Sequence, residues 1–192
     1  MKTRHIAVFL FDGVEELDAV GPFEVLAYWA QEVAPDGEWA IDTVSATGGL
    51  VTGAHGLRIG ADFSVESMPV PEVLVHPGGR GTRPLLRDAG HLRWLTELRQ
   101  DVGLLTSVCT GALPFAAAGL LRNRPATTHW QALDELAALD PSITIRPDDR
   151  FVDDGDVITS AGVSAGIDMA LHLVARLAGD DVSAQVRRGI QY

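Results

Sequence analysis

Short apolar runs alternate along this chain with longer stretches in which apolar residues recur at helical spacing. Runs of about four to eight apolar and β-branched residues are typical of strands buried on both faces of a parallel sheet. The strands predicted in this way cover residues 6–11, 39–45, 73–76 and 103–108. The Gly-rich stretch 48–63 predicts short strands or hairpins, and the polar stretch 153–156 predicts a hairpin turn between strands at 151–152 and 157–159.

Helical spacing follows most of these strands. Residues 23–30 carry one apolar stripe, and Pro22 suits the first turn of the helix that they predict. Further helices are predicted at 88–99, 110–121, 130–139 and 163–178. Strands that alternate with helices predict an α/β fold, with a mostly parallel sheet that helices cover on both faces. Connections are short and no linker is evident, so residues 1–192 are expected to form a single domain.

Folds of this kind bind ligands in the loops at the carboxyl ends of their strands. Three such loops carry reactive or unusual residues here: the acidic loop 12–21, the Gly-rich loop 77–82 and the turn at Cys109. The chemistry of the protein is therefore expected where these three segments meet.

Charge and apolar distribution narrow the class of protein. With 26 acidic and 15 basic residues the net charge is -11, which repels phosphate backbones and argues against a nucleic-acid partner. The apolar run 6–11 is too short for a signal-peptide core, and no stretch approaches the ~18 apolar residues of a membrane span. We therefore expect a cytoplasmic protein with a small-molecule substrate and no membrane contact.

Cys109 is the single cysteine, so no intrachain disulfide can form and its chemistry depends on its surroundings. The predicted strand 103–108 runs straight into it, and Thr110 and Gly111 open the next predicted helix. This order of strand, nucleophile and helix is that of the nucleophile elbow. Free N–H groups at a helix N-terminus favour an anion, so a lowered thiol pKa and a reactive thiolate are predicted. The alternative is a small buried hydrophobe.

Other residues are candidates for completing a site around the cysteine. The N–H groups of Gly79 and Thr110 are candidates for stabilising developing negative charge, whereas the alternative is an ordinary Gly-rich turn. Asp18 either acts as an acid or base or caps the following helix. His129 either reaches the site from the next strand–helix unit or is structural. The six histidines show no metal-ligand spacing, so no metal is expected.

Four motifs, in order along the chain, resemble the ThiJ/PfpI superfamily, whose fold is glutamine amidotransferase-like, a flavodoxin-like three-layer sandwich. The motifs are LFDGVEELDAVGP, HPGGRG, SVCTGALPFAAAGLL followed by RPATTHW, and ITSAGVSAGIDMALHLVARLAG. The resemblance covers essentially the whole chain, and within the superfamily it points most closely to the isonitrile hydratases.

The resemblance implies roles for individual residues. The superfamily's nucleophile falls on Cys109, its following threonine on Thr110, and its first-loop carboxylate on Asp18. An aspartate at this last position, where many members have a glutamate, is similar to the isonitrile hydratase branch. His129 matches a histidine often found near the cysteine.

The substrate-binding residues implied by the resemblance include one departure from the pattern. Arg80 stands where the hydratases tend to have a small polar residue, so it is expected to narrow the pocket or to favour a carboxylate-bearing substrate. The residues expected to contact the substrate are Gly78, Arg80 and His129.

The activity implied by the resemblance is hydration of an isonitrile to an N-substituted formamide through a covalent cysteine thioimidate, without a cofactor. Two alternatives stay open: a glutathione-independent glyoxalase-type reaction on an α-oxoaldehyde, and a non-catalytic redox or ligand sensor. Similar domains stand at the front of AraC-type regulators, but no helix-turn-helix region is expected after Tyr192. Superfamily members are usually homodimers, so a homodimer is expected here.

Overall fold

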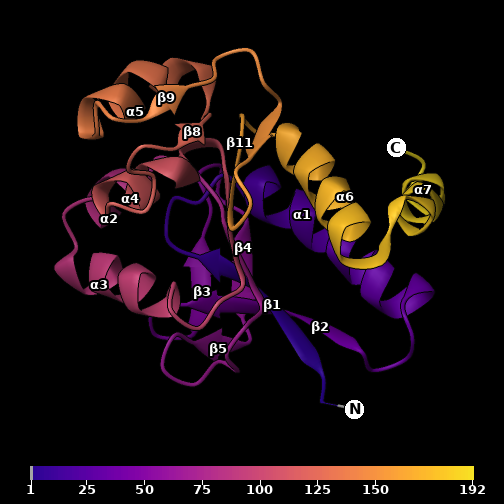
Figure 1. Cartoon of the computed structure of the whole chain (residues 1–192). Helices are drawn as coiled ribbons and strands as arrows, with labels where there is room; N and C mark the ends of the chain where they lie inside the picture. The colour runs from indigo at the N-terminus through magenta and orange to yellow at the C-terminus, as the bar shows by residue number, and fades with distance from the viewer. Residues whose placement is uncertain (1) are drawn as a thin grey trace.

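A seven-stranded sheet lies at the centre of the computed structural model, which describes residues 2–192 (Figure 1). Its strands are β1 (Arg4–Leu10), β2 (Trp39–Ser45), β5 (Phe63–Ser64), β6 (Val73–His76), β7 (Leu104–Val108), β10 (Phe151–Asp153) and β11 (Val157–Ser160). Their order is β10-β11-β7-β6-β1-β2-β5, and only the β10–β11 pair at the edge is antiparallel. Two small sheets pair β3 (Gly49–Thr52) with β4 (Arg58–Ala61) and β8 (Pro125–Ala126) with β9 (Thr144–Ile145).

Helices cover both faces of the sheet, which confirms the predicted α/β fold (Figure 1). One layer contains α1 (Glu16–Tyr28), the π-helical turn Trp29–Val33, α6 (Ala165–Ala178) and α7 (Asp180–Gly189). The other contains α2 (Thr82–Leu85), α3 (Ala89–Leu98), α4 (Ala112–Ala117) and α5 (Leu133–Leu139). Short 3₁₀ turns at Cys109–Gly111 and Trp130–Ala132 precede α4 and α5. Within the described residues, no helix combines the length and apolarity needed to cross a bilayer.

The order of the central strands brings the three predicted loops together. β7, β6 and β1 are parallel neighbours, and all residues of β6 and β7 are buried. Because parallel neighbours end at the same edge of a sheet, the loops that follow β1, β6 and β7 meet there. The segments that follow these three strands carry Asp18, the Gly78–Gly79 pair and Cys109 respectively, with Asp18 in the first turn of α1.

Besides the single turn of α2, which was not predicted, two longer helices differ from the prediction. α1 begins at Glu16, so the predicted acidic loop is largely helical and Pro22 lies inside the helix rather than in its first turn. A stripe of small residues explains this, since Pro22 and Gly21 pack closely on Gly166 and Ile167 of α6. α7 was not predicted because its apolar content is low, and it is docked through the buried residue Val186. In both cases tertiary packing outweighs local propensity.

Candidate functional site

Cys109 sits in a left-handed backbone conformation at the end of β7, with φ of 57°. This conformation is strained for any residue other than glycine, and it is kept only where the surrounding structure holds it. The Cys109 N–H donates to the Ala161 carbonyl at 3.1 Å, and Thr128 Oγ1 donates to the Cys109 carbonyl at 2.6 Å. The predicted strand–cysteine–helix turn is therefore present, and bonds from the residues just after β8 and β11 fix it.

Asp18 lies in the first turn of α1 and is fully buried. The N–H of Gly78 donates to its Oδ2 at 3.1 Å, while its Oδ1 is buried without a hydrogen-bond partner among residues 2–192. Asp18 does not cap the helix, because the cap position belongs to Glu15. A buried carboxyl oxygen without a partner is unusual in a folded protein and calls for a functional explanation.

Burial dominates the acidity of both groups. It raises the pKa of Asp18 to about 7, although its interactions with Cys109 and with the N–H of Gly78 oppose the shift. Burial also raises the pKa of Cys109 to about 12, and repulsion from the Asp18 charge adds to this. The predicted lowering of the thiol pKa is therefore wrong: the thiol is 6% exposed, faces a carboxylate, and precedes a short helix with little dipole. At neutral pH the sulfur keeps its proton and the carboxyl is about half protonated.

Two backbone N–H groups favour the thiolate form of Cys109. Those of Thr110 and Val163 each lower the thiol pKa, against the larger effect of burial. The Val163 N–H also interacts with Asp18. Val163 has φ of 52°, a strained conformation for a β-branched residue, and nothing in its sequence context distinguishes it from the helix predicted to start there. The sequence analysis therefore missed this residue.

The Gly-rich loop supports the site differently from the prediction. The N–H of Gly79 is not free to stabilise an anion, because it donates to Thr110 Oγ1 at 2.9 Å. Gly78 is buried and absent from the cavity lining, so the structure does not bring it to the cavity with the other predicted substrate contacts. Both glycines let the loop approach its neighbours closely: a Cβ on Gly78 would lie 2.5 Å from Thr110 N and 2.9 Å from Asp18 Oδ2.

Gly78→Ala is expected to destabilise the fold by about 1–3 kcal/mol, because the added methyl group overpacks a site with no room. The matched control is Gly60→Ala, where the nearest atom to the added Cβ is 3.9 Å away, in the side chain of Leu50. Urea unfolding of both variants measures the difference. Equal stabilities for the two variants would show that the loop at Gly78 can shift to accommodate a methyl group at little cost in free energy.

A cavity of about 430 Å³ opens onto the cysteine. Arg80 lines it and is exposed, with a guanidinium nitrogen that donates to the Ala54 carbonyl. His129 lines it as well, and its Nδ1 accepts a hydrogen bond from the Gln131 N–H at 3.3 Å. The structure thus brings two of the three predicted substrate contacts to the cavity. The full lining is Glu15, Gly79, Arg80, Arg83, Cys109, Thr110, His129, Gln131, Ala132 and Val163.

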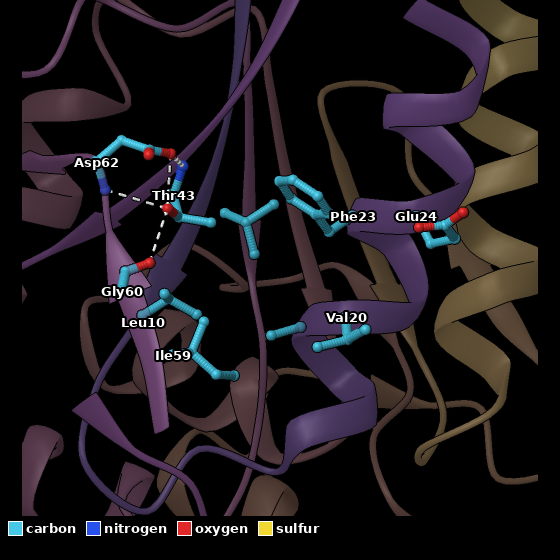
Figure 2. A pocket seen from close by; sticks show the side chains of 10 residues that line it. Leu10, Val20, Phe23, Glu24, Thr43, Ile59, Gly60 and Asp62 are labelled. Atoms are coloured by element: carbon cyan, nitrogen blue, oxygen red, sulfur yellow. Dashed lines mark hydrogen bonds between the residues drawn. The ribbon is translucent and has the colours of Figure 1, made fainter. Parts of the chain in front are cut away.

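A second hollow, of about 420 Å³, lies between α1 and the β3–β4 hairpin (Figure 2). Val20 and Phe23 of α1 face Leu10 and Ile59 across it, and Thr43 and Asp62 hydrogen-bond to each other at its rim. Its lining is mostly apolar and contains no cysteine or histidine. It therefore offers a surface for packing rather than a centre for chemistry.

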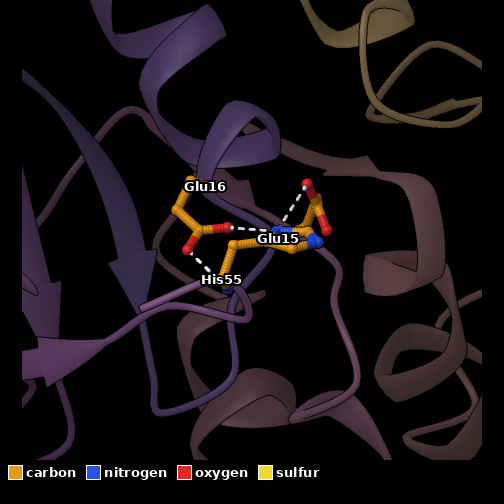
Figure 3. Close-up of side chains that lie close together, drawn as sticks. All are labelled: Glu15, Glu16 and His55. Atoms are coloured by element: carbon orange, nitrogen blue, oxygen red, sulfur yellow. Dashed lines mark hydrogen bonds and ion pairs between the residues drawn. The ribbon is translucent and has the colours of Figure 1, made fainter. Parts of the chain in front are cut away.

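One group of possible metal ligands occurs in the described part of the chain: Glu15, Glu16 and His55 (Figure 3). The Glu16 carboxylate accepts from the His55 N–H at 2.7 Å and lies 3.0 Å from His55 Nδ1. Burial would raise the pKa of Glu16, but these hydrogen bonds and one from Leu57 outweigh it and lower the pKa to about 2. The Glu16 carboxylate thus holds the β3–β4 turn against α1. Both of its oxygens already accept hydrogen bonds from His55, so they are not free to bind a metal ion.

The raised pKa of Asp18 predicts a specific dependence of stability on pH. Between about pH 4 and pH 7 the folded protein keeps a proton that unfolded aspartate, with a pKa of 3.8, has lost. The contribution of Asp18 to the free energy of unfolding is therefore fully present below pH 4 and is lost as the pH rises towards 7. Relative to the wild type, Asp18→Asn is expected to gain about 2 kcal/mol of unfolding free energy between pH 5 and pH 8.

Urea unfolding of both proteins at the two pH values measures this gain. Titration of the buried histidines is common to both proteins and cancels in the difference. A difference that does not change with pH would contradict the raised pKa.

Comparisons with known proteins agree with this fold. A sequence model of the DJ-1/PfpI family matches residues 4–176. The isonitrile hydratase of Pseudomonas putida is 38% identical over 187 residues, which cover 97% of this chain and 78% of that protein. The crystal structure of a ThiJ/PfpI family protein from Pseudomonas syringae superposes with a TM-score of 0.88 at 31% identity, covering 100% of this chain and 76% of the other.

A different kind of relative is similar over a smaller share of its length. The HTH-type transcriptional regulator CdhR of Pseudomonas aeruginosa is 33% identical over 147 residues, which cover 74% of this chain but 42% of the regulator. The similar proteins therefore include both an enzyme and a regulator.

Proposed function

This chain belongs to the DJ-1/PfpI family, and from the geometry of its site we propose that it is an isonitrile hydratase-like enzyme, a cysteine-dependent hydro-lyase. The observation that carries the proposal is the buried Asp18 beside Cys109 in the elbow, with one carboxyl oxygen held by Gly78 and the other unpartnered. The similarity to the Pseudomonas putida enzyme supports it. Residues 1–192 would form one ThiJ/PfpI-type domain, which the single continuous hydrophobic core from β1 to α7 supports.

In the first step the sulfur of Cys109 bonds to the terminal carbon of the isonitrile, R–N≡C. The thiol proton passes to Asp18, whose unpartnered Oδ1 is free to accept it, and Asp18 delivers a proton to the same carbon. The product is the thioimidate R–N=CH–S–Cys109, and no charge or atom is left over. A carboxyl with a pKa of about 7 suits both halves of this transfer at neutral pH.

In the second step Asp18 draws a proton from water while the water oxygen bonds to the thioimidate carbon, and it passes that proton to the nitrogen. Collapse of the tetrahedral adduct forms the C=O bond and breaks the carbon–sulfur bond. The hydroxyl proton moves through Asp18 to the leaving sulfur, which releases the formamide R–NH–CHO and restores the thiol. The N–H groups of Thr110 and Val163 stabilise charge on the sulfur as it leaves. The residues that we propose to act are Cys109 as nucleophile, Asp18 as acid and base, and Thr110 and Val163 as N–H donors.

The second candidate is a glyoxalase-type reaction on an α-oxoaldehyde, which needs a base that moves a proton between two carbons. The position of His129 on the cavity favours this alternative, because a neutral imidazole can offer a basic nitrogen to a substrate proton there. The Nδ1 of His129 already accepts from Gln131, which leaves a protonated Nε2 and weakens its case as a base.

A direct assay separates the two reactions. Purified protein is incubated with a simple alkyl isonitrile, with cyclohexyl isocyanide as the probe, and separately with methylglyoxal. We expect formation of the N-substituted formamide and no lactate above the background rate. Lactate without formamide would favour the second candidate, and neither product would favour a sensor role like that suggested by the similarity to a regulator.

The partner and location predictions also remain proposals. A small-molecule substrate fits the cavity of about 430 Å³, and the cytoplasmic location stays a prediction. We propose a homodimer in which a second copy covers the hollow of Figure 2, because the two segments that form it, α1 and the β3–β4 hairpin, both carry exposed apolar side chains. These side chains are Leu17 and Val20 on α1, and Leu50 and Leu57 on the hairpin segment.

Val20→Glu is expected to convert the dimer to a monomer, because it places a charge in an apolar interface. Size-exclusion chromatography with light scattering measures the mass. Val70→Glu is the control, since Val70 is also exposed but lies in the loop before β6. A wild-type mass of about 20.5 kDa would mean that the chain is monomeric and would refute the dimer.

A further inference from the structure

Two histidines are buried beside the Gly-rich loop but do not line the cavity of Cys109. His76 is the last residue of β6 and is fully buried, while His91 lies in α3 and is 8% exposed. Their Nε2 atoms are 3.1 Å apart, and His76 Nδ1 is 2.9 Å from the Pro77 carbonyl oxygen. The proposed reaction uses neither of them.

The partners determine where the protons are. A carbonyl oxygen only accepts hydrogen bonds, so His76 Nδ1 carries a proton and donates it to Pro77. Burial lowers the pKa of His76 to about 3, so the ring is neutral and its Nε2 is a bare acceptor. His91 Nε2 must then carry the proton of the 3.1 Å bond. The hydrogen bonds run in one direction, from His91 to His76 to Pro77.

The next bond in this direction reaches the proposed catalytic acid. The Pro77 carbonyl and the Gly78 N–H belong to one planar peptide unit, so a bond that holds the oxygen also holds the N–H. That N–H donates to Asp18 Oδ2 at 3.1 Å. We propose that His76 is a positioning residue, which orients the Pro77–Gly78 peptide so that it holds the Asp18 carboxyl, and that His91 fixes the tautomer of His76.

This peptide needs to be held. It leads into Gly78, which is followed by Gly79 with φ of 123°, and two glycines in a row leave a loop free to rotate a peptide plane. A rotated peptide would present the Pro77 carbonyl to Asp18 in place of an N–H and would repel its charge. The His76 ring cannot follow such a rotation, because the rings of Phe9 and Phe115 pack against it with centroids 5.2 and 5.7 Å away.

A role in core packing alone would not require histidine. Phenylalanine would fill a space lined by aromatic rings without burying polar atoms, whereas imidazole costs free energy unless both nitrogens are bonded. Both nitrogens of His76 are bonded, and the second bond needs a second histidine. This pairing therefore points to a requirement for the donor at Nδ1.

The inference rests on the proposed function only in naming Asp18 as the proton carrier, and its test does not depend on turnover. The titratable groups that influence Asp18 are Glu15 and Cys109, while His76 faces His91, which in turn feels Asp88. Of these groups, the variants below change only the histidines. The hydrogen bond from Gly78 lowers the pKa of Asp18, so its loss is expected to raise that pKa above about 7.

The experiment compares His76→Phe, which removes the donor, with His76→Asn, whose side-chain amide nitrogen stands near the position of Nδ1. Aspartate is labelled with ¹³C at the side-chain carboxyl, and the Asp18 signal is identified by its loss in Asp18→Asn. We expect the titration midpoint of Asp18 to move up by roughly half a pH unit or more in His76→Phe and to return towards the wild-type value in His76→Asn. His91→Phe and His91→Gln make the same comparison one hydrogen bond further from Asp18, because His91→Phe removes the donor to His76 and His91→Gln keeps one. We expect a smaller shift of the Asp18 midpoint in this pair.

Turnover adds a second readout if the hydratase assay succeeds. His76→Phe is expected to lower kcat on the order of tenfold at unchanged KM, since Asp18 acts on bond making rather than on substrate binding. An unchanged Asp18 midpoint in a folded His76→Phe variant, or equal midpoints for the Phe and Asn variants, would overturn the inference. If His76→Phe does not fold, the His91 pair decides by the same criterion. Failure of the hydratase assay alone would refute the proposed function and leave the titration result standing.

Discussion

Cys109→Ala is expected to abolish hydration of isonitriles, lowering turnover by about 10⁴-fold or more, because no other group near the cavity replaces the sulfur as nucleophile. The fold should tolerate the change, since the backbone at residue 109 is held by Ala161 and Thr128 and not by the side chain. Formamide formation is measured together with thermal unfolding. The thermal midpoint is expected to stay close to that of the wild type.

The matched control is Ser107→Ala, two residues earlier in β7. Ser107 Oγ is buried without a hydrogen-bond partner among the described residues, so its removal deletes a single atom from the same strand and breaks no bond. This variant is expected to keep full turnover. Substantial activity in Cys109→Ala, or equal losses in the two variants, would end the proposal of covalent catalysis.

Asp18→Asn is expected to separate the reactivity of the thiol from turnover. The amide keeps the size of the side chain but moves no proton, so formamide formation should fall by about 10²–10⁴-fold. The charge of Asp18 raises the pKa of Cys109, so its removal lowers that pKa and increases the thiolate fraction. Alkylation of Cys109 by iodoacetamide at pH 8 should therefore become faster, on the order of tenfold. Because the chain has one cysteine, the alkylation rate reports on this thiol alone.

Glu15→Gln provides the control for this carboxyl-to-amide change. Glu15 also lines the cavity, and its charge raises the pKa of Asp18. Its neutralisation is expected to move the pH profile of turnover to slightly lower pH and to leave the maximal rate nearly unchanged. The assignment of Asp18 would fail if Asp18→Asn retained turnover, and the electrostatic account would fail if alkylation became slower.

Opposite changes in these two rates have one physical origin. A carboxylate beside a buried thiol opposes the thiolate, so the thiol of Cys109 keeps its proton at neutral pH. The same carboxyl can accept that proton when a substrate carbon is in place. The site is therefore best described as a thiol–carboxyl pair that shares protons, in contrast to the preformed thiolate that the sequence pattern predicts.

Most of the architecture could be predicted from the sequence. The strands β1, β2, β6 and β7 are short apolar runs, and a run of this kind has few other folded states available to it. The order of strand, cysteine and helix then predicted the elbow, and the ends of three strands predicted where the loops would meet. Local sequence is sufficient here because burial on both faces leaves a strong and simple pattern.

The acidity of the site and the identity of its hydrogen-bond donors could not be predicted in this way. Each depends on residues distant in sequence. The N–H of Gly78 donates to Asp18, the N–H of Gly79 donates to the Thr110 hydroxyl, and the N–H of Val163 lowers the pKa of Cys109. The sequence by itself determined that the single cysteine of this protein stands between a strand and a helix, and at which edge of the sheet, because strand and helix patterns are local. Only the tertiary structure decided the acidity of that thiol and the hydrogen bonds of the Asp18 carboxyl beside it, because desolvation and contacts between separate segments set both.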